Sequence, residues 1–171
     1  MGRLTPGVAT RFRRPTAGFT LVEILVALAI VAIASSAAWL AWRSGDDASL
    51  RREAERFAGA LEYAAARAQW RHEDLGVSTA RDGWRFWRRD AARRAWVPLA
   101  GDDVLAPRRL PDAVTIASGA VAGRPIAPDA PMPLRANGRN DPSSFVFAAG
   151  EARVRVDADP LNRVTVAKAS E

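Results

Sequence analysis

The chain has 171 residues, of which 49% are hydrophobic and 26% charged, a composition typical of a folded protein with a modest core. It contains no cysteine, which excludes disulfides, thiolate metal ligands and cysteine nucleophiles. The formal charge of +6 is compatible with nucleic-acid binding, but four arginines and no acidic residue precede Phe19. Without that segment the charge is only +2, which weakens the nucleic-acid hypothesis.

A long apolar run follows this basic segment. From Phe19 to Trp42 it is interrupted only by small hydroxyl side chains and by Glu23. As a helix, about 24 residues at ~1.5 Å each span ~36 Å, enough to cross a hydrocarbon core of ~30 Å. Trp39 and Trp42 lie at the far end of the run, where tryptophan commonly anchors a helix at the membrane–water interface. The arginines of residues 1–18 favour a cytoplasmic position for the segment before the run. The sequence therefore predicts a single-pass transmembrane helix over residues 19–42, with the following residues outside the inner membrane.

Glu23 is the one charged side chain in this run. A carboxylate at membrane depth costs about 2.5–3.5 kcal/mol, so it is either a functional residue with a partner or lies in the headgroup region, one helical turn from Phe19. The residues "ASSAA" (34–38) resemble a signal-peptidase site. A disposable signal is nevertheless disfavoured, because the apolar run is longer than a signal core and carries this acid.

The residues Gly18-Phe19-Thr20-Leu21-Val22-Glu23 resemble the type III signal of type IV pilins and pseudopilins, G-F-T-L-x-E. This resemblance implies that residues 1–18 are a leader that a prepilin peptidase removes by cutting between Gly18 and Phe19. It also implies that the same enzyme methylates the new amino group of Phe19. Glycine suits the cut site, because the absence of a Cβ lets the backbone enter a tight cleft.

The resemblance also gives Glu23 a partner. In a filament of packed helices, its carboxylate meets the cationic Phe19 amine of a neighbouring subunit. This pairing offsets the cost of burying the carboxylate and helps to set the axial register of the subunits. The implied partners are other pseudopilins, major and minor, bound through the N-terminal helix, together with the prepilin peptidase and the inner membrane.

Residues 43–74 are predicted to continue the helix in amphipathic form. Apolar side chains recur every three or four residues, with charged side chains between them. The predicted buried stripe comprises Leu50, Ala54, Phe57, Leu61, Ala64 and Ala68. Because such a stripe must pack against another layer, it is expected to form the helical side of the core of a globular head.

Residues 75–171 are predicted to form that head, a β-rich domain on the periplasmic side. Turn residues separate short runs of alternating or β-branched character, which predict antiparallel strands. The predicted strands are 75–79, 83–89, 94–99, 113–116 and 144–149, followed by a hairpin of 153–156 and 163–166. Residues 120–142 are rich in Pro, Gly and Ala, which predicts a long surface loop. The expected fold class is α+β, a long N-terminal helix packed on antiparallel sheets, as in pseudopilins.

Three stretches narrow the resemblance: residues 54–68, 105–116 and 159–166. They are similar to the minor pseudopilin H group of type II secretion, which is related to the FimT-like minor pilins. The implied function is that of a subunit of the periplasmic pseudopilus that supports export of folded proteins. Its head would contact other pseudopilins or a secreted substrate. The alternative is a FimT-like type IV pilin involved in pilus assembly or DNA uptake.

The DNA alternative has a specific set of candidate contacts. Arginines interleaved with tryptophans resemble a surface that holds phosphates and stacks bases. The arginines are Arg85, Arg88, Arg89 and Arg93, with Arg94 beside them, and the tryptophans are Trp84, Trp87 and Trp96. Tryptophans in strands more often belong to a core, and the small charge after residue 18 also disfavours nucleic acid.

Catalytic and metal-binding constellations are not apparent in the sequence. His72 is the only histidine, which excludes histidine triads, and beside Glu73 and Asp74 it is expected to be solvated. Ser143 and Ser144 lack a nucleophile-elbow pattern. Asp157 and Asp159 have a spacing that calcium ligands share, but a turn-forming role is preferred. We therefore predict a non-enzymatic protein without a cofactor or metal.

Overall fold

The computed structural model describes residues 21–169, except for the side chains of residues 36–46. One helix, α1 (Leu21–Arg71), precedes all the strands. The chain divides into two units, residues 1–40 and 41–171, so that the N-terminal part of α1 and the head are described separately. Within the described residues, no helix contains an apolar stretch long enough to cross a membrane. The predicted membrane segment, 19–42, lies partly outside those residues.

The end of α1 has a defined capping structure. His72 adopts a left-handed conformation with φ of 51° and donates its N–H to the carbonyl of Gln69, while the N–H of Glu73 reaches the carbonyl of Ala68. This pair of bonds is the Schellman motif, which satisfies the last helical carbonyls. The His72 side chain is exposed, as the sequence predicts.

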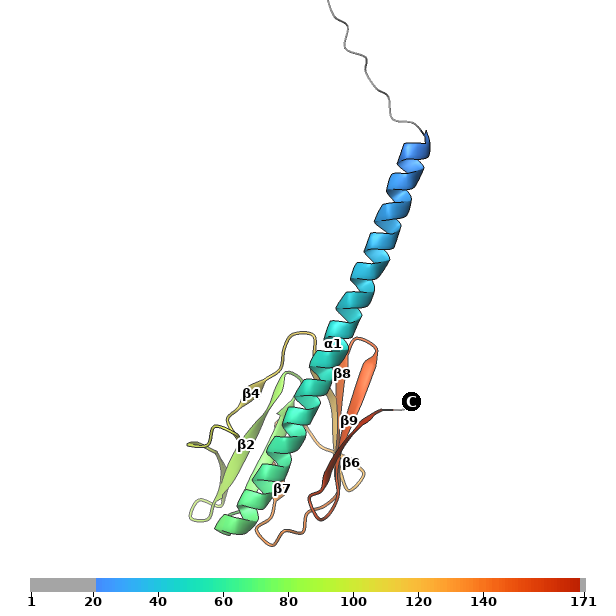
Figure 1. Cartoon of the computed structure of the whole chain (residues 1–171). Coiled ribbons are helices and arrows are strands. Elements are labelled where there is room, and N and C mark those ends of the chain that lie inside the picture. Colours follow the sequence, from blue (N-terminus) through green and yellow to red (C-terminus); the bar gives the residue numbers. More distant parts are fainter. Residues whose placement is uncertain (1–20, 170–171) are drawn as a thin grey trace, which may run out of the picture. The chain divides into compact units, whose positions relative to one another are not determined.

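The head contains two antiparallel five-stranded sheets (Figure 1). Sheet A has the strand order β3-β2-β1-β7, and β4 also pairs with β2. Its strands are β1 (Leu75–Ala80), β2 (Gly83–Asp90), β3 (Ala95–Pro98), β4 (Arg108–Arg109) and β7 (Met132–Leu134). Sheet B has the order β10-β9-β8-β5-β6. Its strands are β5 (Thr115–Val121), β6 (Arg124–Pro125), β8 (Ser143–Ala149), β9 (Ala152–Ala158) and β10 (Val164–Lys168). The α+β prediction is confirmed.

The C-terminal half of α1 packs against both sheets. In Figure 1, β2 and β4 lie on one side of this half and β8 and β9 on the other. The whole predicted stripe, from Leu50 to Ala68, is buried, with each member at most 2% exposed. Alanine supplies half of that stripe.

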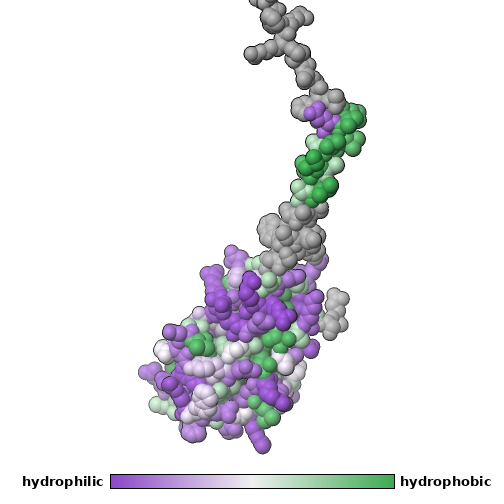
Figure 2. Space-filling model, in the orientation of Figure 1, coloured by the Kyte–Doolittle hydropathy of each residue, from purple (hydrophilic) through white to green (hydrophobic). Residues whose placement is uncertain are grey.

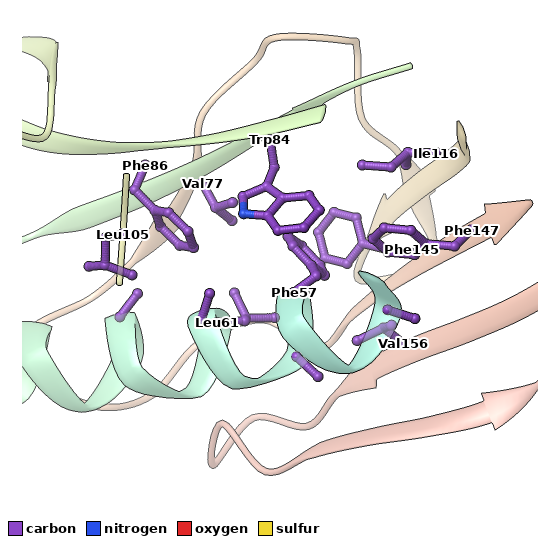
Figure 3. Close-up of a cluster of buried hydrophobic side chains, with 14 of the residues drawn as sticks. Phe57, Leu61, Val77, Trp84, Phe86, Leu105, Ile116, Phe145, Phe147 and Val156 are labelled. Atoms are coloured by element: carbon purple, nitrogen blue, oxygen red, sulfur yellow. The ribbon is translucent and has the colours of Figure 1, made fainter. Parts of the chain in front are cut away.

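Phe57 is the centre of this core (Figure 3). Its ring meets Trp84 of sheet A edge-on, with centroids 5.2 Å apart, and Phe145 of sheet B in the same way at 4.9 Å. Phe147 of sheet B lies 5.4 Å away. Such aromatic pairs add about 0.5–1.5 kcal/mol each to the burial of their area. One helical side chain thus joins the two sheets.

The predicted strands are found, with two corrections in the middle of the head. The strand predicted at 113–116 runs instead from Thr115 to Val121, and it carries a bulge between Ile116 and Ser118. The predicted loop at 120–142 is wrong in part, because it contains β6 and β7.

The strand β7 illustrates the reason for the second error. Met132 and Leu134 are buried and flank Pro133, and β7 pairs with β1 at the edge of sheet A. An edge strand tolerates proline because one side of its backbone needs no ladder bonds. The proline content of residues 120–142 therefore predicted a loop where β7 is in fact a strand with normally alternating apolar side chains.

We predict that Phe57→Ala lowers the free energy of unfolding by about 3–5 kcal/mol, because it leaves a cavity between the two sheets. Chemical denaturation followed by circular dichroism measures this loss. Trp70→Ala is the control on the same helix, since Trp70 is 78% exposed and its loss should change stability by no more than about 0.5 kcal/mol. Equal effects of the two substitutions would contradict the central position of Phe57.

Candidate functional site: assembly helix and basic–aromatic surface

The first candidate is the N-terminal part of α1, where Glu23 lies in the first helical turn and is exposed. A carboxylate at this end complements the partial positive charge of the helix N-terminus. Gly18 and Phe19, the predicted cleavage and methylation residues, lie outside the described residues. The pairing of Glu23 with the Phe19 amine of a neighbouring subunit therefore stays a prediction.

Large apolar side chains surround this acid. They are 48–79% exposed, and Figure 2 shows a mainly hydrophobic surface along the segment. They comprise Leu21, Val22, Ile24, Leu25, Val26, Leu28, Ile30, Val31 and Ile33. Continuous apolar surface of this kind marks contact with a membrane or with another protein.

The second candidate is the face of sheet A that points away from α1. Along β2, Trp84 and Phe86 are buried in the core, whereas Arg85 and Arg89 are exposed, since successive side chains alternate between the faces. Trp87 shares the outer face and is half-buried. Trp96 of β3 pairs with Arg89 in the register and therefore joins the same face.

These four residues, Arg85, Trp87, Arg89 and Trp96, are called here the Arg–Trp face. The guanidinium carbon of Arg85 lies 5.6 Å from the centroid of Trp87, and that of Arg89 lies 5.3 Å from the centroid of Trp96. Both distances allow a cation–π interaction. The face contains two arginine–tryptophan pairs side by side on neighbouring positions of one sheet surface.

Two residues of β1 beneath the Arg–Trp face, Gly76 and Ser78, position both indoles. Trp87 donates its Nε1–H to the hydroxyl of Ser78 at 2.8 Å. Trp96 lies over Gly76, where a Cβ would come within 3.0 Å of the indole Cζ3 atom and 3.2 Å of the Met132 carbonyl. Gly76 and Ser78 carry no functional signal in the sequence, and only the pairing of β1 with β2 shows their role.

The structure separates the other predicted DNA-contact residues. Arg88 falls on the opposite face of β2 from its neighbour Arg89 by the strand alternation. Arg93 lies in the turn between β2 and β3, 3.8 Å from the Asp90 carboxylate. The predicted basic–aromatic cluster is therefore divided: Trp84 belongs to the core, and two of the four arginines belong to the Arg–Trp face.

Four of the candidate catalytic and metal residues lie in sheet B or in its last hairpin: Ser143, Ser144, Asp157 and Asp159. Asp159 accepts hydrogen bonds from the backbone N–H groups of Leu161 and Arg163 at 2.8 and 2.9 Å, as the preferred turn role requires. Asp157 pairs with Arg155 at 2.7 Å. Ser143 and Ser144 line a surface cleft of about 580 Å³ that His72 does not line. Among the described residues, no group of three or more His, Asp or Glu side chains is placed to hold a metal.

A buried carboxylate on α1 links the helix to the segment between β3 and β5. Glu53, 5% exposed, accepts two hydrogen bonds from the guanidinium of Arg108, at 2.7 and 3.1 Å, and a third from Arg56 at 2.9 Å. A two-pronged arginine–carboxylate pair is strong and directional. It fixes β4, a strand of two residues, against the helix.

A second buried network surrounds Arg67. Its guanidinium donates to Glu73 at 2.9 Å and to Asp102. The other oxygen of Asp102 accepts the N–H groups of Val104 and Leu105. Burial raises the pKa of Asp102, but hydrogen bonds from Arg67 and from these two N–H groups outweigh it, so that the pKa lies below the ordinary aspartate value. Asp102 thereby shapes the turn that places Leu105 in the core.

Comparison with known proteins identifies relatives for both parts of the chain. A family model for type II transport protein GspH matches residues 53–162, and one for the prokaryotic N-terminal methylation motif matches residues 13–39. A protein of Aeromonas hydrophila, named type II secretion system protein H, is 30% identical over 106 residues, which are 61% of this chain and 58% of that protein. One of the same name from Pseudomonas aeruginosa is 31% identical over 100 residues, 58% of this chain and 56% of its own length. The match thus spans little more than half the length of these relatives.

A solved structure shares the fold. The minor pseudopilin EpsH from the type II secretion system of Vibrio cholerae superposes with a TM-score of 0.61. The superposition covers 73% of this chain and 97% of that one, at 15% sequence identity. At this identity the likeness establishes the arrangement of helix and sheets, whereas the side chains of the Arg–Trp face are described from this chain alone.

We predict that Asp102→Asn lowers stability by about 1–3 kcal/mol at pH 7, because Arg67 loses a buried charged partner. Since the folded pKa of Asp102 lies below its unfolded value of about 4, its contribution is complete above that pH and is lost as the pH falls through the folded pKa. The acid limb of the stability–pH profile should therefore be shallower in the variant. The neighbouring exposed Asp103→Asn is the control, and an identical profile for both variants would contradict the role of Asp102.

Proposed function

Because this chain belongs to the type II transport protein GspH family, we propose that it is a minor pseudopilin, a structural subunit of the periplasmic pseudopilus of a type II secretion system. The observation that carries this proposal is the match of two family models to one chain, the methylation motif over residues 13–39 and the GspH model over residues 53–162, which include the end of α1 and most of the head. The role is structural rather than catalytic, and it supports export of folded proteins across the outer membrane.

The N-terminal segment supplies processing and anchoring in this proposal. The prepilin peptidase removes residues 1–18 and methylates Phe19, and residues 19–42 then anchor the subunit in the inner membrane. The methylation-motif match over residues 13–39 and the exposed apolar side chains after Leu21 support this step. The head from residue 75 onward, with the amphipathic helix 43–74, lies in the periplasm.

Glu23 is the assembly residue. Its carboxylate pairs with the Phe19 amine of an adjacent subunit when apolar helices pack in the filament. An acid among exposed apolar residues is tolerated in such packing only when an opposite charge meets it. The partners are therefore other pseudopilins, major and minor, and the head is left to contact its neighbours or secreted proteins.

The FimT-like alternative, DNA uptake by a type IV pilus, has less support. The arginines predicted to contact DNA are divided between the two faces of sheet A and a turn. Both named relatives carry the name of the secretion protein. Cross-linking through the N-terminal helix in the host tests the proposed function directly. Recovery of this chain with other secretion pseudopilins would support the proposal, and recovery only with type IV pilus subunits would refute it.

We predict that Glu23→Ala is inserted into the membrane and loses its leader normally but enters filaments poorly, because the Phe19 amine of the neighbour lacks its counter-charge. Quantification of the variant in sheared or overexpressed pseudopili, against the membrane fraction, measures this. Glu55→Ala is the control, since Glu55 is an acid of the same helix that pairs with Arg51 at 2.8 Å. Incorporation of Glu23→Ala at the level of the control would remove the pairing argument.

We further predict that Gly18→Asp keeps its leader, because a charged side chain obstructs the cut site. The leader-bearing form migrates more slowly on a denaturing gel, and N-terminal sequencing of the native protein should begin at Phe19. A native N-terminus beyond Ser36 would instead indicate removal of the apolar segment and would refute the anchoring role.

A further inference from the structure

We propose that the Arg–Trp face of sheet A binds an extended, carboxylate-rich segment of a partner protein. Arg85 and Arg89 hold the carboxylates, and Trp87 and Trp96 receive the apolar side chains between them. This inference concerns the outer surface of the head and goes beyond the filament role, because it stands on the geometry of this face alone.

The guanidinium groups of Arg85 and Arg89 have hydrogen-bonding capacity to spare. Among the described residues, neither side chain forms an ion pair or a side-chain hydrogen bond, and each instead stacks on an indole. Several other arginines are paired with carboxylates of the chain, among them Arg56, Arg67, Arg108, Arg155 and Arg163. Stacking orients the guanidinium but leaves its N–H edge available for a bidentate carboxylate.

The two acidic residues near this face accept hydrogen bonds from backbone N–H groups. Asp90 accepts the N–H groups of Ala92 and Arg93 at 2.9 and 3.0 Å. Asp74 accepts the N–H of Ala136 at 3.1 Å. Because neither carboxylate pairs with Arg85 or Arg89, both guanidiniums of the Arg–Trp face remain available to an anionic partner of complementary charge.

The face is also apolar and rigid enough to recognise side chains. Ser78 and Gly76 hold the two indoles in place, and a cleft of about 450 Å³ opens beside Trp96. Arg89, Trp96, Pro133 and Arg135 are among its lining residues. Aromatic and arginine side chains in such fixed positions are the usual anchors of protein interfaces, since little conformational entropy is lost on binding.

The spacing favours a polypeptide over a nucleic acid. Arg85 and Arg89 are four residues apart on one strand, about 13 Å at ~3.3 Å per residue, and carboxylates four residues apart on an extended peptide match that distance. Nucleic-acid binding draws its affinity from many phosphate contacts, about 6–10 in typical cases. This face offers two guanidiniums and one more at the cleft, because Arg88 points to the other face.

The test uses the full-length processed protein in detergent micelles. The probe is a fluorescent synthetic peptide with three repeats of Glu-Val-Phe-Val, and its binding is followed by anisotropy against the same peptide with Gln in place of Glu. We expect only the acidic peptide to bind, with an affinity that falls as salt is added. Arg85→Gln with Arg89→Gln should weaken binding by about tenfold or more.

The control variant is Arg88→Gln with Arg124→Gln, which removes the same charge from the opposite face of β2 and from strand β6. It should bind as the native protein does, and thermal unfolding should show both variants folded. A third variant, Arg85→Lys with Arg89→Lys, keeps the charge but loses the planar fork and should bind several-fold more weakly.

Three results would overturn the proposal. The first is equal binding of the acidic and amide peptides, or no binding of either. The second is an equal loss in the two glutamine variants, which would reduce the effect to net charge. The third is tighter binding of a thymidine oligonucleotide that depends on Arg85 and Arg89, which would assign the face to nucleic acid. Each result is independent of filament assembly, so that failure here leaves the pseudopilin role standing.

Discussion

The seating of one apolar helix stripe between two sheets is the constraint on which the head depends. Neither sheet has a complete core of its own, because Phe57 supplies the ring that Trp84 on one side and Phe145 on the other both pack against. Burial of that ring is thus shared by three layers of structure. The ion pairs of the buried side chains Glu53 and Arg67 are secondary to it, since they attach an irregular segment to a helix that the apolar stripe has already positioned.

Sequence periodicity was sufficient for this constraint and for most strands. The spacing of Leu50 to Ala68 marks the core face of α1 without any knowledge of its partner. The alternation along 153–156 and 163–166 marks the last hairpin, which the structure extends by a few residues. It was insufficient for β7 because edge position, which makes proline acceptable, is a property of the sheet and not of the segment. The two-residue strands β4 and β6 are too short to carry any period.

The candidate site was partly predictable for a related reason. The alternation of side chains along β2 assigns Trp84 to one face and Arg85 and Arg89 to the other. The prediction of one basic–aromatic cluster did not use this alternation and therefore combined residues of both faces. The floor under the indoles required the strand pairing, because Gly76 and Ser78 come from a different strand. Recognition of the N-terminal motif needed no structure at all, since short contiguous motifs depend on chemistry along the chain rather than on tertiary contacts.

The glycine beneath Trp96 links two positions that lie 20 residues apart. Any side chain at position 76 would press on the indole ring and on a neighbouring carbonyl. Alanine there would require the indole or the carbonyl to shift by a few tenths of an ångström, and a larger side chain would require a smaller residue at position 96 or a displaced strand. Positions 76 and 96 are therefore expected to change together during evolution, as a small–large pair, and the presence of both in a homologue would mark inheritance of this particular surface.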